Sequence, residues 1–314
     1  MQLDVVLPTY NRHALLERAL KSLLAADVPA GLDVKVTIVD NNSKDTTAAV
    51  VDSFKPAFAG RLHYLFEPKP GKSHALNTGI TATSGELVGM IDDDEEIDRY
   101  WFVRIREIFA NKELDFIGGP YVPRWVTPPP SWLPSRYSGV IGAVNLGPER
   151  RAYGRDTTMP GGNAVVKRST LEKLMPYCTD LGPHGNYYLA DEDSDMYLKL
   201  IESGAKGLYL PDLIVYHYIH PERVSKHYYR HWCFRRGISS AILDREHPKD
   251  VAYFMGVPRY LFGQAARATV QIAKSVFKRN EDPAENFSNE LSFWDLAGFF
   301  YGKHFYRPNT NSEA

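Results

Sequence analysis

Three consecutive aspartates, Asp92 to Asp94, follow a short apolar run at residues 87–91. In an extended segment the side chains of Asp92 and Asp94 point to the same side, so their carboxylates can act together. Hard oxygen ligands in this arrangement suit Mg²⁺ or Mn²⁺, and such an ion can bridge the two phosphates of a nucleotide. The acidic run continues with Glu95, Glu96 and Asp98. A solvated acidic turn is therefore the alternative interpretation.

The elements that would position these aspartates are visible in the first hundred residues, where short apolar runs alternate with helical patterns. Strands are expected at residues 3–7, 34–39, 62–66 and 87–91. Apolar residues at helical spacing occur between them, at residues 14–25, 46–54 and 74–81. Strands of this length joined by helices predict right-handed crossovers and a mainly parallel sheet. The fold class is therefore α/β, with helices flanking a central sheet.

Polar residues stand at the ends of three predicted strands. They are Pro8–Asn11, Asp40–Ser43 and Asp92–Asp94. Ligands of such sheets bind outside the carboxyl ends of the strands, so these three segments should converge on one cleft. This position favours a metal site over a solvated turn at the aspartates. Several carboxylates in one cleft should also raise some of their pKa values.

Asp40 could accept a hydrogen bond from the N–H of a nucleotide base, with Asn42 close by. A structural role is also open, because Asp40 could cap the helix that begins near residue 46, although Ser43 or Asp45 is better placed to do so. Asn11 could likewise cap the helix that follows the first strand.

The middle and the end of the chain have a different character. Residues 120–160 are rich in proline and contain Trp132 and other aromatic residues, which favours an ordered lid or acceptor wall over a linker. A helix is expected from Asp195 to Glu202, and long helical segments follow His217. We expect two domains, at residues 1–220 and 221–314.

Two basic segments lie in the second expected domain. In residues 223–236, Arg230 or Arg235 could meet a diphosphate, and a solvated helix face is the alternative. Residues 259–279 form an amphipathic helix, which could pack on the first domain or lie on an anionic membrane surface. The basic side of this helix consists of Arg259, Arg267, Lys274 and Lys278.

The composition excludes several classes of protein. A net charge of −1 argues against a general nucleic-acid binder. The two cysteines, Cys178 and Cys233, have no metal-type spacing and fit a reducing compartment. The first residues lack the features of a signal peptide, and no uncharged stretch of about 20 residues occurs. We therefore expect a cytoplasmic protein.

Seven short motifs occur in an order and spacing that resemble the family 2 glycosyltransferases. They are Pro8–Arg12, Val39–Ser43, Gly71 with Ala75–Ile80, Ile91–Asp94, Gly161–Ala164, Glu192–Asp195 and Pro211–His217. The resemblance covers roughly residues 3–217, and the remaining tail is similar to those of bacterial polysaccharide-assembly members. It implies a GT-A fold for the catalytic domain, a nucleotide-sugar donor and inversion at the anomeric carbon.

The resemblance also implies roles for residues of the donor site. Pro8, Thr9 and Tyr10 would line the nucleoside site, and Asp40 would contact the base. Leu76 stands where many relatives carry arginine, so Lys72 or Arg12 would meet the phosphate charge. The other residues expected to bind the nucleotide are Asn11, Arg12, Asn42, Lys72, Asn77 and Asp92.

The metal site and the general base follow from the same resemblance. Asp92 and Asp94 match the family's Asp-x-Asp, with Asp94 as the direct metal ligand. His217 would add a ligand to the metal or the diphosphate, or it is a core histidine that ends a strand. Asp193 would be the base that removes the proton of the acceptor hydroxyl, and Glu192 would orient the acceptor or the base.

Two of these motifs keep a structural alternative. The pair Glu192 and Asp193 could form an acidic helix N-terminus that the helix dipole stabilises. Gly161, Gly162 and Asn163 would allow the backbone to approach the donor sugar or the acceptor, or they form an ordinary turn.

The sequence therefore predicts an inverting, metal-dependent glycosyltransferase with a nucleotide-diphosphate donor, for which a UDP-sugar is favoured. A glycan or lipid-linked glycan acceptor is expected, in bacterial exopolysaccharide, O-antigen or other cell-surface glycan synthesis. A sugar-nucleotide or glycan-binding protein without turnover is one alternative. A nucleotidyltransferase is another, but it should carry a glycine-rich loop after its first strand. A dinucleotide oxidoreductase would need G-x-G-x-x-G there, and the sequence lacks it.

Overall fold

The computed structural model describes residues 1–110, 113–184, 187–188, 191–277 and 282–307, and it divides into two compact units. The first unit comprises Met1–Arg124, Gly142–Asn186 and Glu192–Tyr218. The second comprises Trp125–Ile141, Tyr187–Asp191 and Ile219–Ala314. The second unit thus contains the C-terminal part of the chain together with the proline- and aromatic-rich segment at 125–141.

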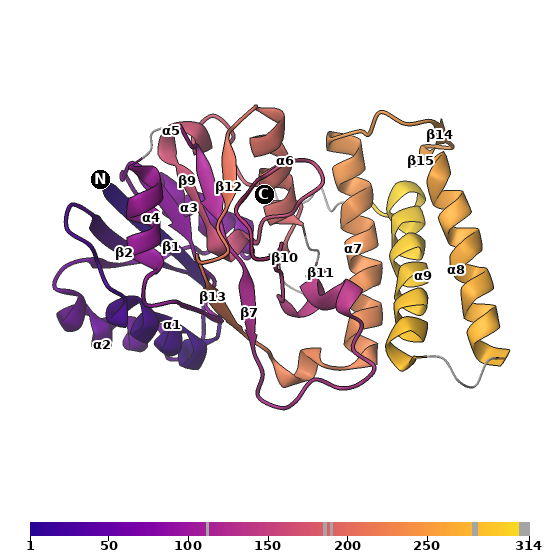
Figure 1. The fold of residues 1–314 in the computed structure, drawn as a ribbon. Coiled ribbons are helices and arrows are strands. Elements are labelled where there is room, and N and C mark those ends of the chain that lie inside the picture. Colours follow the sequence, from indigo (N-terminus) through magenta and orange to yellow (C-terminus); the bar gives the residue numbers. More distant parts are fainter. Residues whose placement is uncertain (111–112, 185–186, 189–190, 278–281, 308–314) are drawn as a thin grey trace. The chain divides into compact units, whose positions relative to one another are not determined.

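An eight-stranded sheet forms the centre of the first unit (Figure 1). In spatial order its strands are β3 (Leu62–Phe66), β2 (Asp33–Asp40), β1 (Gln2–Thr9), β4 (Leu87–Met90), β9 (Ala164–Lys167), β6 (Phe116–Gly118), β12 (Gly207–Tyr209) and β8 (Arg151–Ala152). The first four run parallel to one another, and β6 is parallel to β12, whereas β9 and β8 run antiparallel to their neighbours. The predicted mainly parallel sheet is confirmed.

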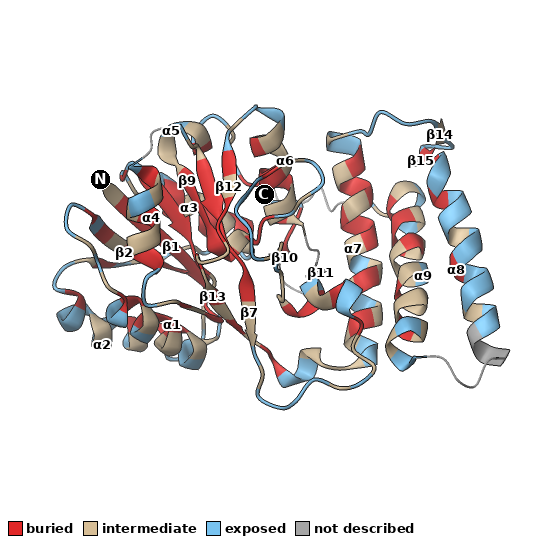
Figure 2. Cartoon of the chain, viewed as in Figure 1, coloured by how far each residue is buried: buried red, intermediate tan, exposed pale blue. Residues whose placement is uncertain are grey.

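The central strand β1 is apolar on both faces, as expected of a buried parallel strand. Because successive side chains alternate in direction, Leu3, Val5 and Leu7 belong to one core cluster, whereas Val6 belongs to the other. Trp101 fills the first cluster, and Leu76 is buried in the second. The central strands of this sheet are buried, as their red colour in Figure 2 shows, whereas the edge strands β3 and β8 are mostly not. Its carboxyl edge is therefore held by a rigid support.

Helices and short helical turns connect these strands. They are α1 (His13–Ala25), α2 (Thr47–Phe58), α3 (Lys72–Thr81), α4 (Trp101–Phe109), η2 (Gly161–Asn163), α5 (Arg168–Leu171) and α6 (Glu192–Glu202). Two-residue strands, β10 (Pro183–His184) and β11 (Tyr187–Tyr188), precede α6. Helix α6 begins three residues before the predicted start, so Glu192 and Asp193 lie in its first turn. The acidic helix N-terminus considered from the sequence is therefore present.

A small second sheet brings distant parts of the first unit together. Its strands, in spatial order, are β5 (Glu95–Ile97), β13 (Val215–Tyr218) and β7 (Tyr121–Arg124). Strand β5 pairs antiparallel with β13, and this register sets Glu95 directly opposite His217. The acidic turn after β4 therefore ends beside a histidine from the far end of the unit.

The starts of α1 and α2 are held in different ways. Helix α1 has no side-chain cap, and Asn11 instead adopts a left-handed conformation in which its Oδ1 accepts from the Lys44 backbone N–H at 2.7 Å. At α2, Asp45 accepts from the backbone N–H of Thr47 at 3.0 Å. The expectation that Asn11 caps a helix is therefore wrong. At the start of α2, Asp45 rather than Asp40 accepts the hydrogen bond from the backbone N–H.

The second unit is mainly helical. Its elements are η1 (Ser135–Ile141), η3 (Pro221–Arg223), α7 (Lys226–Glu246), β14 (Tyr253–Phe254), β15 (Val257–Pro258), α8 (Arg259–Phe277) and α9 (Pro283–His304). Helix α9 packs against both α7 and α8 (Figure 1). Two glycines allow α7 and α9 to approach closely: a Cβ on Gly237 would lie 2.1 Å from the Asp295 carbonyl oxygen, and one on Gly298 would lie 1.9 Å from that of Phe234.

Helix α8 is amphipathic, as predicted. Its buried residues, among them Leu261 and Ala268, face α9 of the same unit. Of the basic side expected from the sequence, Arg259, Arg267 and Lys274 are exposed, whereas Lys278 lies outside the described residues. Over the ranges that the structure describes, no helix is both long and apolar enough to span a membrane.

Candidate active site

The acidic turn between β4 and β5 meets the end of β1. Asp93 is buried, and it accepts hydrogen bonds from the Thr9 hydroxyl and from the Arg12 guanidinium, each at 2.9 Å. Arg12 also donates to Asp94 at 3.1 Å. Two of the strand ends that the sequence predicted to converge therefore do so. Thr9 and Arg12, expected at the nucleotide, contact the aspartates themselves.

A group suited to a metal ion lies beside this turn. Asp94, Glu95 and His217 are all buried, and one ligand atom from each falls within 4.8 Å of the others. The Nε2 atom of His217 lies 3.5 Å from Asp94 Oδ1, and the His217 ring stacks on Tyr121 at 5.5 Å.

The chemistry of this group fits a hard divalent cation. Glu95 is 1% exposed; its Oε2 accepts from the Asp92 backbone N–H at 2.9 Å, and its Oε1 has no hydrogen-bond partner among the described residues. A buried carboxylate oxygen without a partner is costly unless a cation meets it. Two carboxylates and an imidazole suit Mn²⁺, and carboxylate oxygens also suit Mg²⁺.

The composition of this group differs from the set expected from the sequence. Asp92 was expected to act with Asp94 and His217, but its carboxylate accepts from Lys72 at 3.0 Å, and Glu95 completes the group in its place. Glu95 was missed because it looked like a continuation of a solvated turn. The signal that identifies it is its register with His217, which the sequence does not reveal.

Lys72, the first residue of α3, joins the acidic turn to α6. Its ammonium nitrogen lies 3.0 Å from Asp92 Oδ2, 3.2 Å from Asp193 Oδ2 and 3.3 Å from Glu192 Oε1. The Lys72 side chain is only 16% exposed, so these contacts are shielded from solvent. One lysine therefore links carboxylates from two motifs that the sequence analysis treated separately.

Burial and neighbouring charges raise the pKa values of Asp93 and Glu192, as expected of carboxylates in a crowded cleft. Burial, together with Asp94, raises the pKa of Asp93 to about 6, although Arg12 opposes this effect. Burial and the nearby Asp193 raise the pKa of Glu192 to about 7. Burial acts in the opposite direction on Lys72, but Asp193, Asp92 and Glu192 raise its pKa well above the ordinary value. The cluster therefore favours added positive charge.

Two glycines make room for these carboxylates. A Cβ on Gly161 would lie 1.9 Å from Cγ of Asp193, and one on Gly162 would lie 2.4 Å from Oε2 of Glu95. The backbone at these two glycines lies close to Asp193 and Glu95, and its predicted approach to the donor sugar or the acceptor stays a prediction. Asn163 is fully buried and bonds to Trp101 Nε1 and to the carbonyls of Pro120 and Leu213. Asn163 therefore has a structural role, and its expected contact with the donor sugar or the acceptor stays a prediction.

Other residues expected at the nucleotide are held by the protein in different ways. Asp40 is buried, accepting from the Ser43 backbone N–H at 2.8 Å and from the Tyr64 hydroxyl at 2.6 Å. Asn77 bonds to both the N–H and the carbonyl of Tyr177. Asp40 therefore orders the loop after β2, and Asn77 orders a distant loop.

The end of β1 and the loop after β2 complete the expected nucleotide set. Pro8 is buried, whereas Tyr10 is 56% exposed. Asn42 adopts a left-handed conformation and accepts from Lys44 Nζ at 2.6 Å. Asn41, which the sequence analysis did not select, bonds to the carbonyls of Glu67 and Lys69 and to the Gly71 N–H. It fixes the loop that leads to Lys72.

Three expected ligand residues belong to the second unit. Trp132 packs edge-on against Tyr229 and Phe287, with ring centroids 5.7 and 5.3 Å away. Arg230 forms a two-pronged ion pair with Glu290. Arg235 is exposed on α7. Trp132 and Arg230 therefore have structural partners, which leaves Arg235 as the exposed candidate for a diphosphate.

The fold of this chain is also found in solved structures of glycosyltransferases. The fold is similar to that of mannosyltransferase PcManGT from Pyrobaculum calidifontis, which was solved in complex with GDP-Man and Mn²⁺. The TM-score is 0.64 at 18% identity, covering 96% of this chain and 86% of that one. The fold is thus of the GT-A glycosyltransferase type.

The family model for glycosyl transferase family 2 matches residues 4–175, so the chain belongs to this family and is a glycosyltransferase. It is 24% identical to the succinoglycan biosynthesis protein ExoM of Rhizobium meliloti, over 89% of this chain and 88% of that protein. It is 26% identical to a glucosyl-dolichyl phosphate glucuronosyltransferase of Haloferax volcanii, over 79% of each.

Proposed function

We propose that this glycosyltransferase moves a sugar, with inversion and with the help of a divalent metal, from a nucleoside diphosphate to an acceptor hydroxyl. The observation that carries the proposal is the double contact of Lys72, with Asp92 in the acidic turn and with Asp193 at the start of α6. Through this lysine, the acidic turn that carries the metal-type group is joined to a base-type carboxylate.

On the donor side, Asp94, Glu95 and His217 would hold Mn²⁺ or Mg²⁺. The ion would neutralise the charge that develops on the diphosphate as the sugar leaves. Asp40, at the end of β2, would accept from the N–H of the base. We propose a UDP-sugar as donor, and GDP-Man, the ligand of the archaeal structural neighbour, is the alternative to be tested.

On the acceptor side, Asp193 would act as the general base. As the acceptor oxygen forms its bond to the anomeric carbon, its proton passes to the Asp193 carboxylate, and the bond to the diphosphate breaks on the opposite face. Asp193 is the more accessible of the two acidic residues, with 26% of its side chain exposed against 7% for Glu192. Attack from the face opposite the leaving group produces inversion.

Lys72 and Glu192 would position this base. The Lys72 ammonium holds Asp193 at Oδ2, and the Gly161 backbone lies where any larger residue would displace the carboxylate. Glu192 contacts the same lysine at 3.3 Å. We therefore assign Lys72 to the base rather than to the donor phosphates, for which Arg12 remains the candidate in the described part of this unit.

The names of the relatives support a glycan acceptor. One relative is named for succinoglycan biosynthesis, and another for transfer to a glucosyl-dolichyl phosphate. We propose that the acceptor is a glycan, free or lipid-linked, in the synthesis of a bacterial surface polysaccharide. The enzyme would then work in the cytoplasm, at the inner face of the membrane that carries such lipids.

The proposal is tested by transfer assays with UDP- and GDP-sugars, with Mn²⁺ or with a chelator, and by NMR of the anomeric configuration of the product. Asp193→Asn should lower kcat by about 1000-fold, because general-base catalysis contributes effects of this size. Donor binding should stay within a few-fold of the wild-type value, and Asp180→Asn, at an exposed carboxylate, serves as the matched control. Retained anomeric configuration, or wild-type transfer by Asp193→Asn, would refute the mechanism.

A further inference from the structure

One segment of the second unit combines exposed apolar side chains with charge of a single sign. Residues 251–280 contain no aspartate or glutamate. Their basic residues are Arg259, Arg267, Lys274, Lys278 and Arg279. An ordinary solvated surface mixes both signs of charge. A surface that lacks carboxylates and carries cations is complementary to an anionic partner.

The tip of the β14–β15 hairpin is strongly apolar. Phe254 is 57% exposed and Met255 is 71% exposed. Met255 has φ +49° and Gly256 has φ +73°, so a bulky residue occupies a left-handed position that asparagine or glycine normally fills in such turns. In a turn that only faces solvent, a methionine at this position is unfavourable. The outlier therefore points to a function for the exposed thioether side chain.

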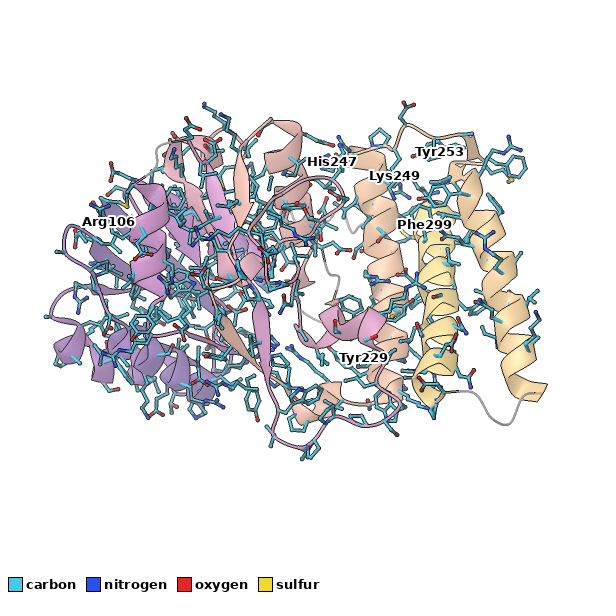
Figure 3. The ribbon with its side chains drawn as sticks, viewed as in Figure 1. Arg106, Tyr229, His247, Lys249, Tyr253 and Phe299 are labelled. Atoms are coloured by element: carbon cyan, nitrogen blue, oxygen red, sulfur yellow. The ribbon has the colours of Figure 1, made fainter. Side chains whose placement is uncertain are left out.

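The hairpin is anchored to the helices of its own unit. Figure 3 labels Lys249 and Tyr253 near the end of α7, where the Tyr253 hydroxyl donates to Asp244 at 2.9 Å. Asp244 in turn pairs with Lys303 of α9 at 2.7 Å, and both side chains are buried. Phe254 packs edge-on against Phe262 of α8. The apolar tip is thus presented on a fixed support.

The outer face of α8 continues this surface. Tyr260 and Val270 are 40% and 52% exposed, and they share this face with the cations Arg259, Arg267 and Lys274. The buried residues of α8 lie on the opposite side, toward α9. The exposed colour along most of α8 in Figure 2 follows this division. The apolar side of α8 is thus used within the unit, and its outer face offers cations with two apolar side chains to an anionic surface.

We infer that the β14–β15 tip and the outer face of α8 dock onto an anionic lipid bilayer. Phe254 and Met255 enter the boundary between headgroups and acyl chains, while the cations of α8 meet lipid phosphates. Apolar insertion and electrostatic attraction then act together, as stable peripheral binding requires. The inference deepens the proposed action on lipid-linked glycans, but the binding needs neither donor nor transfer, so the two proposals can fail separately.

Vesicle flotation of the full chain tests this surface. We expect binding to vesicles of phosphatidylcholine with about one third phosphatidylglycerol at low salt, and at least about tenfold weaker binding to pure phosphatidylcholine. Arg267→Glu combined with Lys274→Glu should weaken binding to the anionic vesicles at least about tenfold. Failure of the wild-type chain to bind the anionic vesicles at low salt would overturn the inference.

A second variant separates insertion from folding. Met255→Asn suits the left-handed turn, so its Tm should equal or exceed that of the wild type while vesicle binding falls about tenfold. Val126→Asn, at a residue 55% exposed elsewhere in the second unit, is the matched control and should bind like the wild type. Unchanged binding by Met255→Asn would overturn the inference. Loss of self-association by this variant, without any vesicle binding of the wild type, would instead identify a second copy as the partner.

Discussion

The two units treat buried charge in different ways. In the described part of the first unit, a single ammonium group, that of Lys72, is shared by Asp92, Glu192 and Asp193. In the described part of the second unit, charges form matched pairs, such as the buried pair of Lys303 with Asp244 at 2.7 Å and the half-buried pair of Arg236 with Asp295 at 2.7 Å.

This difference distinguishes a cluster that can bind a ligand from ion pairs that stabilise the fold. A matched pair needs nothing further, because each charge neutralises the other within the fold. A crowded carboxylate cluster with raised pKa values is poised to take up a cation or a proton. The first unit therefore has the electrostatics of a site, and the second has those of a scaffold.

The largest expected effect on stability comes from replacing one buried lysine in each unit with an uncharged residue. Lys72→Met and Lys303→Met should each lower the free energy of unfolding by about 3–5 kcal/mol, because each leaves a buried carboxylate without its partner. Mn²⁺ should restore more stability to Lys72→Met than to Lys303→Met, since only the first unit offers it a carboxylate cluster. Urea unfolding with and without Mn²⁺ measures both. If Mn²⁺ restored the same stability to both variants, the two units would not differ in their ability to bind a cation.

A smaller effect is expected from Lys72→Arg, which keeps the charge but changes its shape. A displacement of Asp193 of about 1 Å should lower kcat roughly 100-fold while leaving KM for the donor within a few-fold. Steady-state kinetics measure both constants, and Lys69→Arg, at an exposed lysine nearby, is the control. A raised KM with unchanged kcat would instead mean that Lys72 binds the donor phosphates.

Two substitutions that replace a carboxylate with its amide can identify the metal ligands. Glu95→Gln should weaken Mn²⁺ binding at least about tenfold, because it removes a charged hard ligand. Asp92→Asn should weaken it less, because Asp92 lies against Lys72. Calorimetric Mn²⁺ titration of both variants gives the order. The reverse order would favour the aspartate pair that the sequence suggests.

The smallest expected effect lies at a carboxylate of the first unit that is paired in the ordinary way. Burial would raise the pKa of Asp45, but hydrogen bonds from Thr47 and His13 lower it to about 2. Asp45→Asn should therefore cost about 1 kcal/mol at pH 7, as loss of a capping carboxylate does. This stabilisation is complete above the unfolded pKa near 4 and is lost as the pH falls toward 2.

Urea unfolding of Asp45→Asn and wild type between pH 7 and pH 2 checks this sign. The difference in free energy of unfolding between the two proteins should disappear as the pH falls. A difference that does not change with pH would mean that the charge of Asp45 contributes nothing to stability. The contrast between this paired carboxylate and the crowded carboxylates would then not hold.

The sequence predicted the parts of this fold that depend on local patterns. The strands at 3–7 and 34–39 appear where their apolar runs place them, because a run that is buried on both faces is a local signal. The strand at 62–66 also appears at its predicted bounds, although only Leu62 in it is buried. The start of α6 was placed too late, since its first turn is polar and carries no apolar period.

The features that escaped prediction depend on pairing across the chain. Glu95 becomes a candidate ligand only through the register of β5 with β13. The contact of α7 with α9 requires Gly237 and Gly298 to face each other, and neither glycine has a distinctive local context. Asp93, placed between two expected ligands, proved to be the aspartate that Thr9 and Arg12 hold.

The contact of Lys72 with Asp193 has a consequence for synthesis of the enzyme. These residues are 121 positions apart in the chain, and His217 emerges from the ribosome later still. A nascent chain that has formed the strands up to β4 already carries the acidic turn, but it lacks both the proposed base and one proposed metal ligand. With Asp193 as the proposed base and His217 as a proposed metal ligand, a nascent chain that ends before residue 217 would lack transferase activity, since such long-range contacts form late. The first unit would then become active only when its last strand, β13, has joined the small second sheet.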